Sequence, residues 1–340
     1  MIDSFGDSSQ FYSKQLPKPQ PKAGELCIRL KATGFNPVDY KTRSGMYGGQ
    51  LPLILGADCS GIVEKLGFGV DTFKVGDEVY AMPFGRGSNG AYAEFCCLPV
   101  KLVAKKPSTV SFAAAAAIPL VAMTAYRATI EARTISKGDA IFIAGAGGGL
   151  GSFAVQLANH IGVKSIFTIA KTQAGAEFLV NSLGLKKDNI VIYEGLSLEA
   201  LHAKILAKNA GNLFDATFDF VGRDMKQLCL ELTRHSGHCS TVLTENPDFS
   251  LPVWQYGLCF NRSLSIHLVF VGAESCELSQ DLLNIYQRHL AHISQLFEAG
   301  ILKAPHITDL GVLSVETVQK AHELLESNRV KGKLIMRINE

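Results

Sequence analysis

The sequence lacks a long apolar run, a large net charge and a paired-cysteine motif, and each absence excludes a class of protein. The longest nearly unbroken apolar stretch, Phe112 to Tyr126, is too short to cross a bilayer and contains Pro119. The opening residues, MIDSFGDSSQ, show no basic segment followed by an apolar run, so we expect no secretory signal. We therefore expect no membrane partner and a cytoplasmic location.

The net charge and the cysteine spacing exclude further classes of partner and predict the state of the thiols. The formal net charge is +2, too small to indicate a nucleic-acid partner or a polybasic membrane anchor. The eight cysteines form no C-x-x-C pair, so we expect reduced thiols that serve as small buried residues.

The length and the turn pattern predict two domains. A chain of 340 residues exceeds the size at which a single hydrophobic core stops growing. Up to about residue 112, short apolar runs are broken by frequent turns, which is typical of a β-rich, barrel-like unit. From Ala113 we expect a helix that Pro119 either kinks or divides. Strands that alternate with helices follow it, which predicts an α/β fold with a doubly wound parallel sheet. We expect LSIHLVFVG (264–272) to be the last strand of that sheet. Two amphipathic helices and the strand KGKLIMRI (331–338) follow it.

A glycine-rich turn, AGAGGGLG (144–151), follows the apolar strand AIFIAG and opens a helix. Backbone N–H groups at a helix N-terminus can approach a pyrophosphate when no side chain is in the way. The spacing Ala146-x-Gly148-x-x-Gly151 fits the dinucleotide fingerprint with alanine in the first place. We therefore predict a dinucleotide contact at Ala146, Gly148, Gly149, Leu150 and Gly151.

The end of the second strand favours NADPH over NADH. An acid about 20 residues after the glycines would bind the ribose 2′-hydroxyl of NAD, but Ile169-Ala170-Lys171-Thr172 contains none. Lys171 would instead attract a 2′-phosphate. The alternative interpretation of Lys171 is a solvated surface lysine.

Seven sequence motifs follow one another in a characteristic order along nearly the whole chain. They are ATGFNPVDYKTRSGMY (32–47), LPLILGADCSGIVEKLG (51–67), FKVGDEVYA (73–81), GAYAEF (90–95), AAAIPLVAMTAY (115–126), GAGGGLGSFAVQLA (145–158) and LLESNRVKGKLIMRI (324–338). With these motifs the chain resembles the zinc-free quinone oxidoreductase (ζ-crystallin-like) branch of the medium-chain dehydrogenase/reductase superfamily. The resemblance implies a GroES-like β-rich catalytic domain (1–115 and 273–340), a Rossmann NADPH-binding domain (116–272) and a homodimer.

The same resemblance implies that no metal is bound. Zinc-dependent members carry G-H-E-x-x-G, whereas this chain has Gly56-Ala57-Asp58-Cys59-Ser60-Gly61. The upstream catalytic cysteine of those enzymes aligns with Asn36, and their four-cysteine structural zinc loop is reduced to GRGSNGAYAEF. A catalytic zinc needs three protein ligands, so we interpret Cys59 as a buried residue. The pairs His235/His238, expected at a helix end with a glycine turn, and His289/His292, expected on one helix face, also lack a full ligand set.

Without a Lewis acid, an electron-poor double bond or quinone is an easier target than an alcohol. We therefore expect NADPH-dependent reduction of quinones or α,β-unsaturated carbonyls. By resemblance, Tyr47 and Asn36 are the candidate catalytic residues, and further cofactor contacts fall on Asn36, Thr124, Tyr193 and Lys333. Asn36 as a turn residue and Tyr47 as a half-buried aromatic are the alternatives.

Two other functions stay open. One is a 2-enoyl thioester reductase, disfavoured because no basic cluster for a phosphopantetheine is evident near Tyr47 beyond Lys41, Arg43 and Arg86. The other is a non-catalytic NADPH-binding protein with a sensing or RNA-binding role. Two departures from the family pattern also stand out: Gly175 occupies a position where a lysine is common, and the usual first strand looks shortened.

Overall fold

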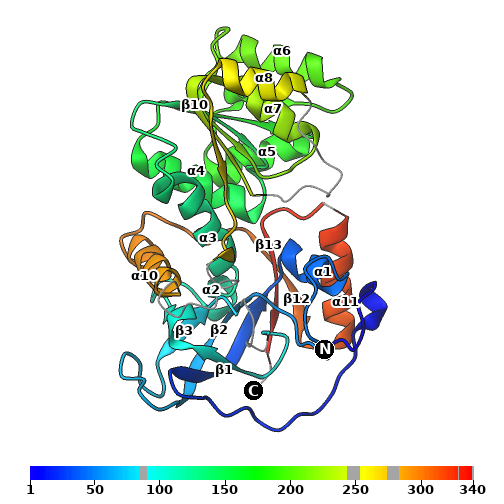
Figure 1. Ribbon diagram of the computed structural model, residues 1–340, viewed down its shortest axis with the longest axis vertical. Helices are drawn as coiled ribbons and strands as arrows, with labels where there is room; N and C mark the ends of the chain where they lie inside the picture. Colours follow the sequence, from blue (N-terminus) through cyan, green and yellow to red (C-terminus); the bar gives the residue numbers. More distant parts are fainter. Residues whose placement is uncertain (84–89, 243–252, 274–282, 328, 339–340) are drawn as a thin grey trace. The chain divides into compact units, whose positions relative to one another are not determined.

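The computed structural model describes residues 1–83, 90–242, 253–273, 283–327 and 329–338 (Figure 1). They form an α/β structure of two compact units, so the predicted fold class is confirmed. The first unit comprises Met1–Met123 and Val271–Glu340, and the second comprises Thr124–Phe270.

The first unit is built around a seven-stranded sheet in the order β12-β13-β1-β2-β3-β5, with β4 also paired to β1. Its strands are β1 (Glu25–Gly34), β2 (Asp58–Leu66), β3 (Glu78–Ala81), β4 (Phe95–Pro99), β5 (Val103–Lys105), β12 (Ile307–Val312) and β13 (Lys333–Arg337). One edge of β1 pairs with β4 over its first half and with β13 over its second half. This shared edge joins the two sequence segments of the unit. Strand β12 was not expected from the sequence.

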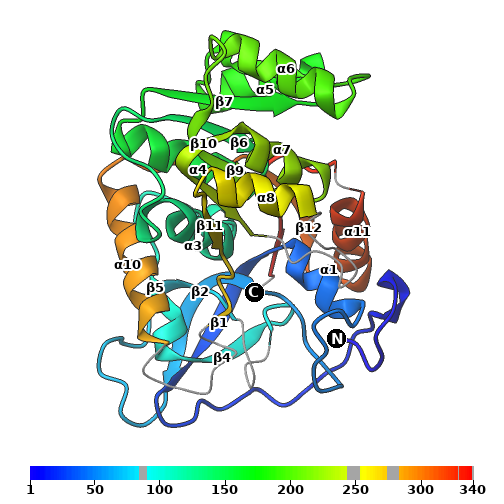
Figure 2. The same cartoon turned by 45° about the horizontal axis from the view of Figure 1, so that its top comes forward.

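The helices of the first unit are α1 (Pro37–Arg43), α2 (Phe112–Ala115), α10 (Asn284–Glu298) and α11 (Val315–Glu326). Figures 1 and 2 show α1 beside α11, and the two helices contact one another. α1 begins with Pro37 at its first position, where a missing N–H costs nothing, and Asn36 is its N-cap. The chain then leaves the unit through α3 (Pro119–Tyr126). Of the two alternatives expected at Pro119, a kink or a division, the structure shows the division into two helices.

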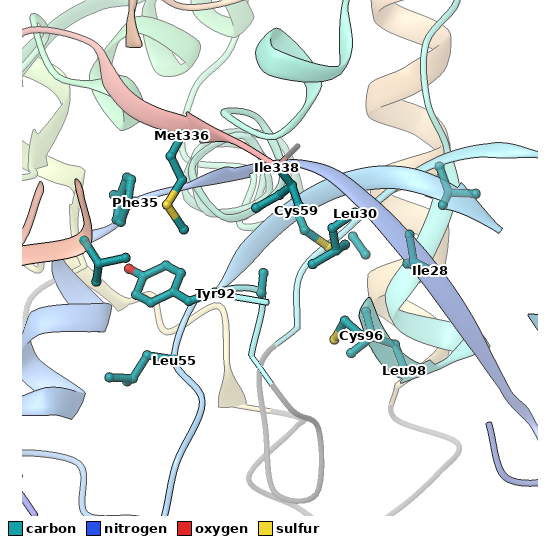
Figure 3. Packing of buried hydrophobic residues seen from close by; sticks show 14 of the residues in the cluster. Ile28, Leu30, Phe35, Leu55, Cys59, Tyr92, Cys96, Leu98, Met336 and Ile338 are labelled. Atoms are coloured by element: carbon teal, nitrogen blue, oxygen red, sulfur yellow. The ribbon is translucent and has the colours of Figure 1, made fainter. Parts of the chain in front are cut away.

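The core of the first unit consists mainly of side chains from its strands and from α11. Figure 3 shows Cys59 from β2 in a cluster with Leu30, Met336 and Ile338. Burial raises the pKa of the Cys59 thiol well above its usual range. Cys59 therefore behaves as an apolar core residue.

The second unit contains a six-stranded parallel sheet in the order β11-β10-β9-β6-β7-β8. Its strands are β6 (Ala140–Ala144), β7 (Ser165–Ala170), β8 (Ile190–Ile192), β9 (Phe214–Asp219), β10 (Thr233–Thr241) and β11 (Ser265–Leu268). Its helices are α4 (Gly149–Ile161), α5 (Gln173–Leu183), α6 (Leu198–Lys208), α7 (Asp224–Leu232) and α8 (Val253–Asn261). The strand expected in LSIHLVFVG is β11, at one edge of the sheet.

The expectation for RHSGHC was wrong. Helix α7 ends at Leu232, and His235 and His238 lie in strand β10 rather than at a helix end with a glycine turn. A Cβ on Gly237 would lie 2.9 Å from the Asp215 carbonyl oxygen. Gly237 therefore allows the strands to pack closely. A glycine needed for close packing looks the same in the sequence as a glycine in a turn. Within the described ranges, no helix is long and apolar enough to cross a membrane.

Candidate functional site

The glycine-rich turn joins β6 to α4 in the second unit. Gly145 has φ +92°, a conformation that L side chains rarely adopt. A Cβ on Gly151 would collide with the Gly145 carbonyl oxygen, so only glycine allows α4 to pack this closely on the turn. Ala146 is fully buried beneath the turn.

The N-terminus of α4 is open toward a ligand. Gly148 is its N-cap and provides no side-chain hydrogen bond to the first turn. A Cβ on Gly148 would meet only the Gly145 carbonyl oxygen, at 3.6 Å. Packing therefore requires glycine at 151 but leaves room at 148, which fits the close approach of a pyrophosphate to backbone N–H groups. Gly149 and Leu150 form the first turn of the same helix.

Lys171 and Tyr193 lie together at the carboxyl edge of the parallel sheet. Lys171 directly follows β7, and Tyr193 directly follows β8. The Tyr193 N–H donates to the Ala170 carbonyl (3.0 Å), and the Glu194 N–H donates to the Lys171 carbonyl (3.1 Å). The Lys171 side chain is exposed. The glycine turn, Lys171 and Tyr193 thus follow three neighbouring strands, β6, β7 and β8, at one edge of the sheet.

Asp219, at the end of β9, supports the glycine turn and was not among the residues expected from the sequence. Its carboxylate is fully buried and accepts hydrogen bonds from the N–H groups of Val221 (3.0 Å) and Gly222 (2.6 Å) and from the Thr241 hydroxyl (2.9 Å). The loop that it fixes packs on Gly145, where an added Cβ would lie 3.1 Å from the Val221 side chain. The sequence signal that could have identified Asp219 is its position as the last residue of an apolar strand. Thr124, also predicted, is buried in α3 at the start of the second unit.

In the first unit, three polar side chains form what we call the buried triad: Asn36, Asp58 and Lys333. The Lys333 ammonium donates to Asn36 Oδ1 (2.5 Å), to the Phe35 carbonyl (2.9 Å) and to Asp58 Oδ2 (3.2 Å). Asn36 Nδ2 donates to Asp58 Oδ2 (2.8 Å). Asp58 Oδ1 accepts from the Leu120 N–H (2.8 Å). Asn36 and Asp58 are fully buried, and Lys333 is 4 % exposed.

The buried triad satisfies its charges internally. An ammonium group has three donors, and all three of Lys333 are used. Burial raises the pKa of the Asp58 carboxyl, while the Lys333 ammonium and the hydrogen bonds from Asn36 and Leu120 oppose that rise. Removing one partner of such a pair costs about 3–5 kcal/mol because the other charge stays buried. The triad therefore fixes Asn36 in one orientation.

A second set of buried polar groups, the buried relay, continues from the triad: Asp39, Tyr92, His322 and Arg43. The Asn36 N–H donates to Asp39 Oδ2 (2.8 Å), and the Tyr92 hydroxyl hydrogen-bonds to Asp39. The Tyr92 oxygen lies 3.1 Å from His322 Nε2, and Arg43 Nη1 lies 3.4 Å from His322 Nδ1. Because a guanidinium can only donate, Nδ1 accepts and the neutral imidazole carries its proton on Nε2.

Burial shifts two pKa values of the relay in opposite directions. It raises the pKa of Asp39 to about 7, partly offset by the hydrogen bond from the Asn36 N–H. Burial and the neighbouring Arg43 lower the pKa of His322 to about 3. Arg43 also donates to the Gly6 carbonyl (3.0 Å) and to Glu326 (2.6 Å), so the relay ties α1 to α11.

Tyr47 lies in the turns that follow α1 and is 43 % exposed. Asn36 precedes the same helix, whose seven residues span about 10 Å. The structure therefore brings Asn36 together with Lys333 but leaves Tyr47 at the other end of α1. The Asn36 amide is therefore held in place by hydrogen bonds, whereas the Tyr47 hydroxyl lies on a side chain that is accessible to solvent.

The histidine pairs lie in other elements than the residues described above. His289 and His292 lie in α10, and His238 Nδ1 lies 3.1 Å from His267 Nε2 across β10 and β11. Among the described residues, no three histidine, cysteine or acidic side chains gather as a ligand set. Residues 84–89, part of the segment that resembles a shortened structural zinc loop, lie outside the described residues.

Two family models match the chain. The alcohol dehydrogenase GroES-like domain matches residues 22–108, and the zinc-binding dehydrogenase domain matches residues 185–336. The GroES-like expectation for the first unit is thereby confirmed.

Individual relatives extend over most of the chain. A 2-methylene-furan-3-one reductase of Solanum lycopersicum is 31 % identical over 94 % of this chain and 73 % of its own length. A probable quinone oxidoreductase of Schizosaccharomyces pombe is 28 % identical over 100 % of this chain and 96 % of its own length. The solved structure of a mycobacterial protein complexed with NADPH has a TM-score of 0.83 at 24 % identity, covering 99 % of this chain and 98 % of that one.

Proposed function

The chain belongs to the medium-chain dehydrogenase/reductase superfamily of oxidoreductases, and on that premise we propose that it transfers hydride from NADPH to quinones or α,β-unsaturated carbonyls without zinc. The observation that carries the proposal is the carboxyl edge of the second sheet. There an uncapped, glycine-lined helix N-terminus and an exposed lysine follow neighbouring strands. The names of the two relatives, an enone reductase and a quinone oxidoreductase, support the acceptor class.

The residues at this edge fit NADPH. Backbone N–H groups at the start of α4 would hold the pyrophosphate, and Gly148 leaves the room for its approach. Lys171, after β7, would hold the 2′-phosphate, and Tyr193, after β8, would border the adenosine. Thr124 is a further proposed contact, carried over from the family. When bound, NADPH supplies the hydride.

The residues at the family's zinc position do not fit a zinc ion. Ala57 has no ligand atom, and Cys59 is a buried core residue whose thiol holds its proton. Asp58 Oδ2 is 3.2 Å from the Lys333 ammonium, which already occupies the place of a cation beside that carboxylate. We therefore derive no step through zinc, although the matching family model is named for it.

The chain's own contribution is to hold the acceptor and supply hydrogen bonds to its oxygen. Tyr47 is accessible and carries a phenol that can donate a hydrogen bond or a proton. Asn36 is held by Lys333 and Asp58, so any contact that it makes is pre-oriented. Lys333 uses its three donors on Asn36, Asp58 and the Phe35 carbonyl, which favours a role in holding Asn36 over a direct cofactor contact.

A homodimer is also proposed. Strand β11 forms an edge of the second sheet, and its Leu268 side chain is 81 % exposed. An exposed apolar edge strand is a template for pairing with a second copy. Light scattering of the wild type and of Leu268→Lys tests this proposal: we expect a dimer that the lysine weakens, and a monomeric wild type would overturn it.

The function is tested with a panel of quinones, enals, enones and enoyl thioesters, each with NADPH and with NADH. We expect turnover of quinones or enones with NADPH. Turnover confined to enoyl thioesters, or none at all, would overturn the proposed acceptor class.

The cofactor site is tested with Lys171→Ala and the matched control Lys164→Ala. Lys164 is exposed at the opposite end of the same strand. Losing a charge-assisted hydrogen bond costs about 1.5–3 kcal/mol, so NADPH affinity should fall about 10–100-fold in Lys171→Ala. NADH affinity should stay unchanged in both variants. Equal losses for both cofactors in Lys171→Ala would remove its phosphate role.

A further inference from the structure

Two cysteines that lie 70 positions apart in sequence meet across the first sheet. Cys27 of β1 and Cys97 of β4 are directly opposite one another in an antiparallel ladder. Their side chains are in hydrogen-bond contact. The structure forms no disulfide among the seven described cysteines, so this pair is a dithiol.

The ladder's hydrogen bonds define the type of this pair. The Val100 N–H donates to the Gly24 carbonyl (3.0 Å), and the Leu30 N–H donates to the Glu94 carbonyl (2.9 Å). Hydrogen-bonded and non-hydrogen-bonded pairs alternate along an antiparallel ladder. Cys27 lies three residues from both Gly24 and Leu30, so Cys27 and Cys97 form a non-hydrogen-bonded pair.

A non-hydrogen-bonded pair has the spacing that a disulfide needs. Its Cα atoms lie about 4.5 Å apart, inside the range of about 4.4–6.8 Å found in disulfides. The Cβ atoms of opposite residues lie about 4.5–5.5 Å apart, whereas a disulfide draws them to about 3.8 Å. The bond can therefore close with a strand shift of about 1 Å. The strain of that shift makes it easily reducible.

The surroundings of the pair favour a thiolate at Cys27, because the hydrogen bond that Cys97 donates lowers the pKa of Cys27 and raises that of Cys97. The hydrogen bond from Cys97 lowers the pKa of Cys27, and Lys18 and Lys65 add to this lowering, against the effects of burial and Glu64. Both lysines are held nearby: Lys18 bonds to Glu64 (2.5 Å), and Lys65 donates to Gln20 (2.6 Å). A thiolate is the reactive form of cysteine.

The two sulfurs differ in accessibility. Cys27 is 1 % exposed, whereas Cys97 is half-buried. The neighbouring residue, Cys96, points to the other face and is fully buried in the core. A peroxide therefore approaches the pair from the side of Cys97 and meets the Cys27 thiolate directly opposite, with the Cys97 thiol in place to complete the bond.

We propose that Cys27 and Cys97 are a redox modification site that closes into a reversible cross-strand disulfide on exposure to a peroxide. The thiolate sulfur attacks one peroxide oxygen, the O–O bond breaks, and the departing oxygen leaves as water after taking up a proton. The resulting sulfenic acid is attacked by the second thiol, the S–S bond forms, and a second water leaves. Two thiols and one hydrogen peroxide give one disulfide and two waters, so the sulfurs lose the two electrons that the peroxide gains.

The test treats the folded protein with hydrogen peroxide and maps its cysteines by alkylation and mass spectrometry. The wild type should lose two alkylatable thiols and the mass of two hydrogens, yield a linked Cys27–Cys97 peptide, and recover both thiols with dithiothreitol. Cys97→Ser should give no linked peptide. Cys259→Ser, a control in the second unit, should behave as the wild type does.

Outcomes that overturn the proposal are equally specific. They are Cys27 and Cys97 both remaining alkylatable, or a linkage to another cysteine. A third is irreversible sulfinic acid at Cys27 that forms in the wild type as readily as in Cys97→Ser. If Cys97→Ser folds poorly, Cys97→Ala and the wild-type peptide map still decide between these outcomes. None of these measurements depends on the proposed catalytic activity.

Discussion

The buried relay contains two groups whose titrations should affect stability in opposite directions. Asp39 has a pKa raised to about 7, and His322 has a pKa lowered to about 3. In the wild type we expect the two titrations to have opposite effects on the free energy of unfolding and so to offset one another. Replacing either residue should therefore reveal the pH dependence that the other one causes. The perturbations are Asp39→Asn and His322→Gln, each of which retains hydrogen-bonding atoms for the relay.

The direction in which each group changes the free energy of unfolding follows from the direction of its pKa shift. The folded state holds the Asp39 proton up to about pH 7, whereas the unfolded chain releases it near 3.8, so the stability from Asp39 is lost as pH rises through that window. The folded state keeps His322 neutral down to about pH 3, whereas the unfolded chain protonates it near 6.5, so the stability from His322 is lost as pH falls. The two windows overlap between about pH 4 and 6.5.

The magnitude follows from linkage. One proton of difference between the folded and unfolded states changes the free energy of unfolding by about 1.4 kcal/mol per pH unit. From about pH 6.5 to about pH 4.5, Asp39→Asn should therefore lose about 3 kcal/mol relative to the wild type. Over the same range, His322→Gln should gain a similar amount, because only the Asp39 effect remains.

The assay is urea unfolding at a series of pH values, with each variant compared with the wild type. Contributions from all other groups cancel in that difference, and a constant offset from the substitution leaves the slope unchanged. Asp71→Asn, at an exposed position, is the control and should run parallel to the wild type. A free-energy difference between Asp39→Asn and the wild type that stays constant across the range would refute the reasoning.

Three further outcomes test the sites. Tyr47→Phe should lower turnover about 100-fold or more while leaving NADPH affinity unchanged, as expected of a proton or hydrogen-bond donor; an unaltered rate in steady-state kinetics would reduce Tyr47 to packing. Gly148→Ala should keep its unfolding midpoint but lose NADPH binding in calorimetry. Gly151→Ala should lose about 3 kcal/mol of stability, because a Cβ at position 151, unlike one at 148, would collide with the backbone. Lys333→Met should cost about 3–5 kcal/mol in urea unfolding, and adding Asp58→Asn should restore more than half of it; additive losses would contradict the ion pair.

The arrangement of residues at the proposed nucleotide-binding edge could be predicted from sequence because its signals are local. The turn Gly145–Gly151 lies between an apolar strand and a helix, and Lys171 follows the next strand directly. In a parallel sheet the ends of neighbouring strands share one edge, so strand order alone brings these residues together. The family pattern supplied the rest of the candidates, including Thr124 and Tyr193.

The buried triad could not be predicted in the same way. Asp58 and Lys333 stand 275 positions apart, and only the pairing of β13 with β1 brings them within 3.2 Å. Each is a charged residue in an apolar strand and therefore requires a partner, but the sequence does not say which partner. The pair Cys27 and Cys97 was missed for the same reason, because strand register is a tertiary property.

The division of the first unit into two segments has a consequence for synthesis on the ribosome. Residues 124–270 emerge as one continuous stretch, while the first 123 residues lack β13 until the chain has passed residue 337. During that interval Asp58 and Asn36 have no ammonium to hold them, and one edge of β1 stays partly unpaired. The nascent N-terminal segment is therefore the part that chaperones should occupy longest, and the second unit should mature first.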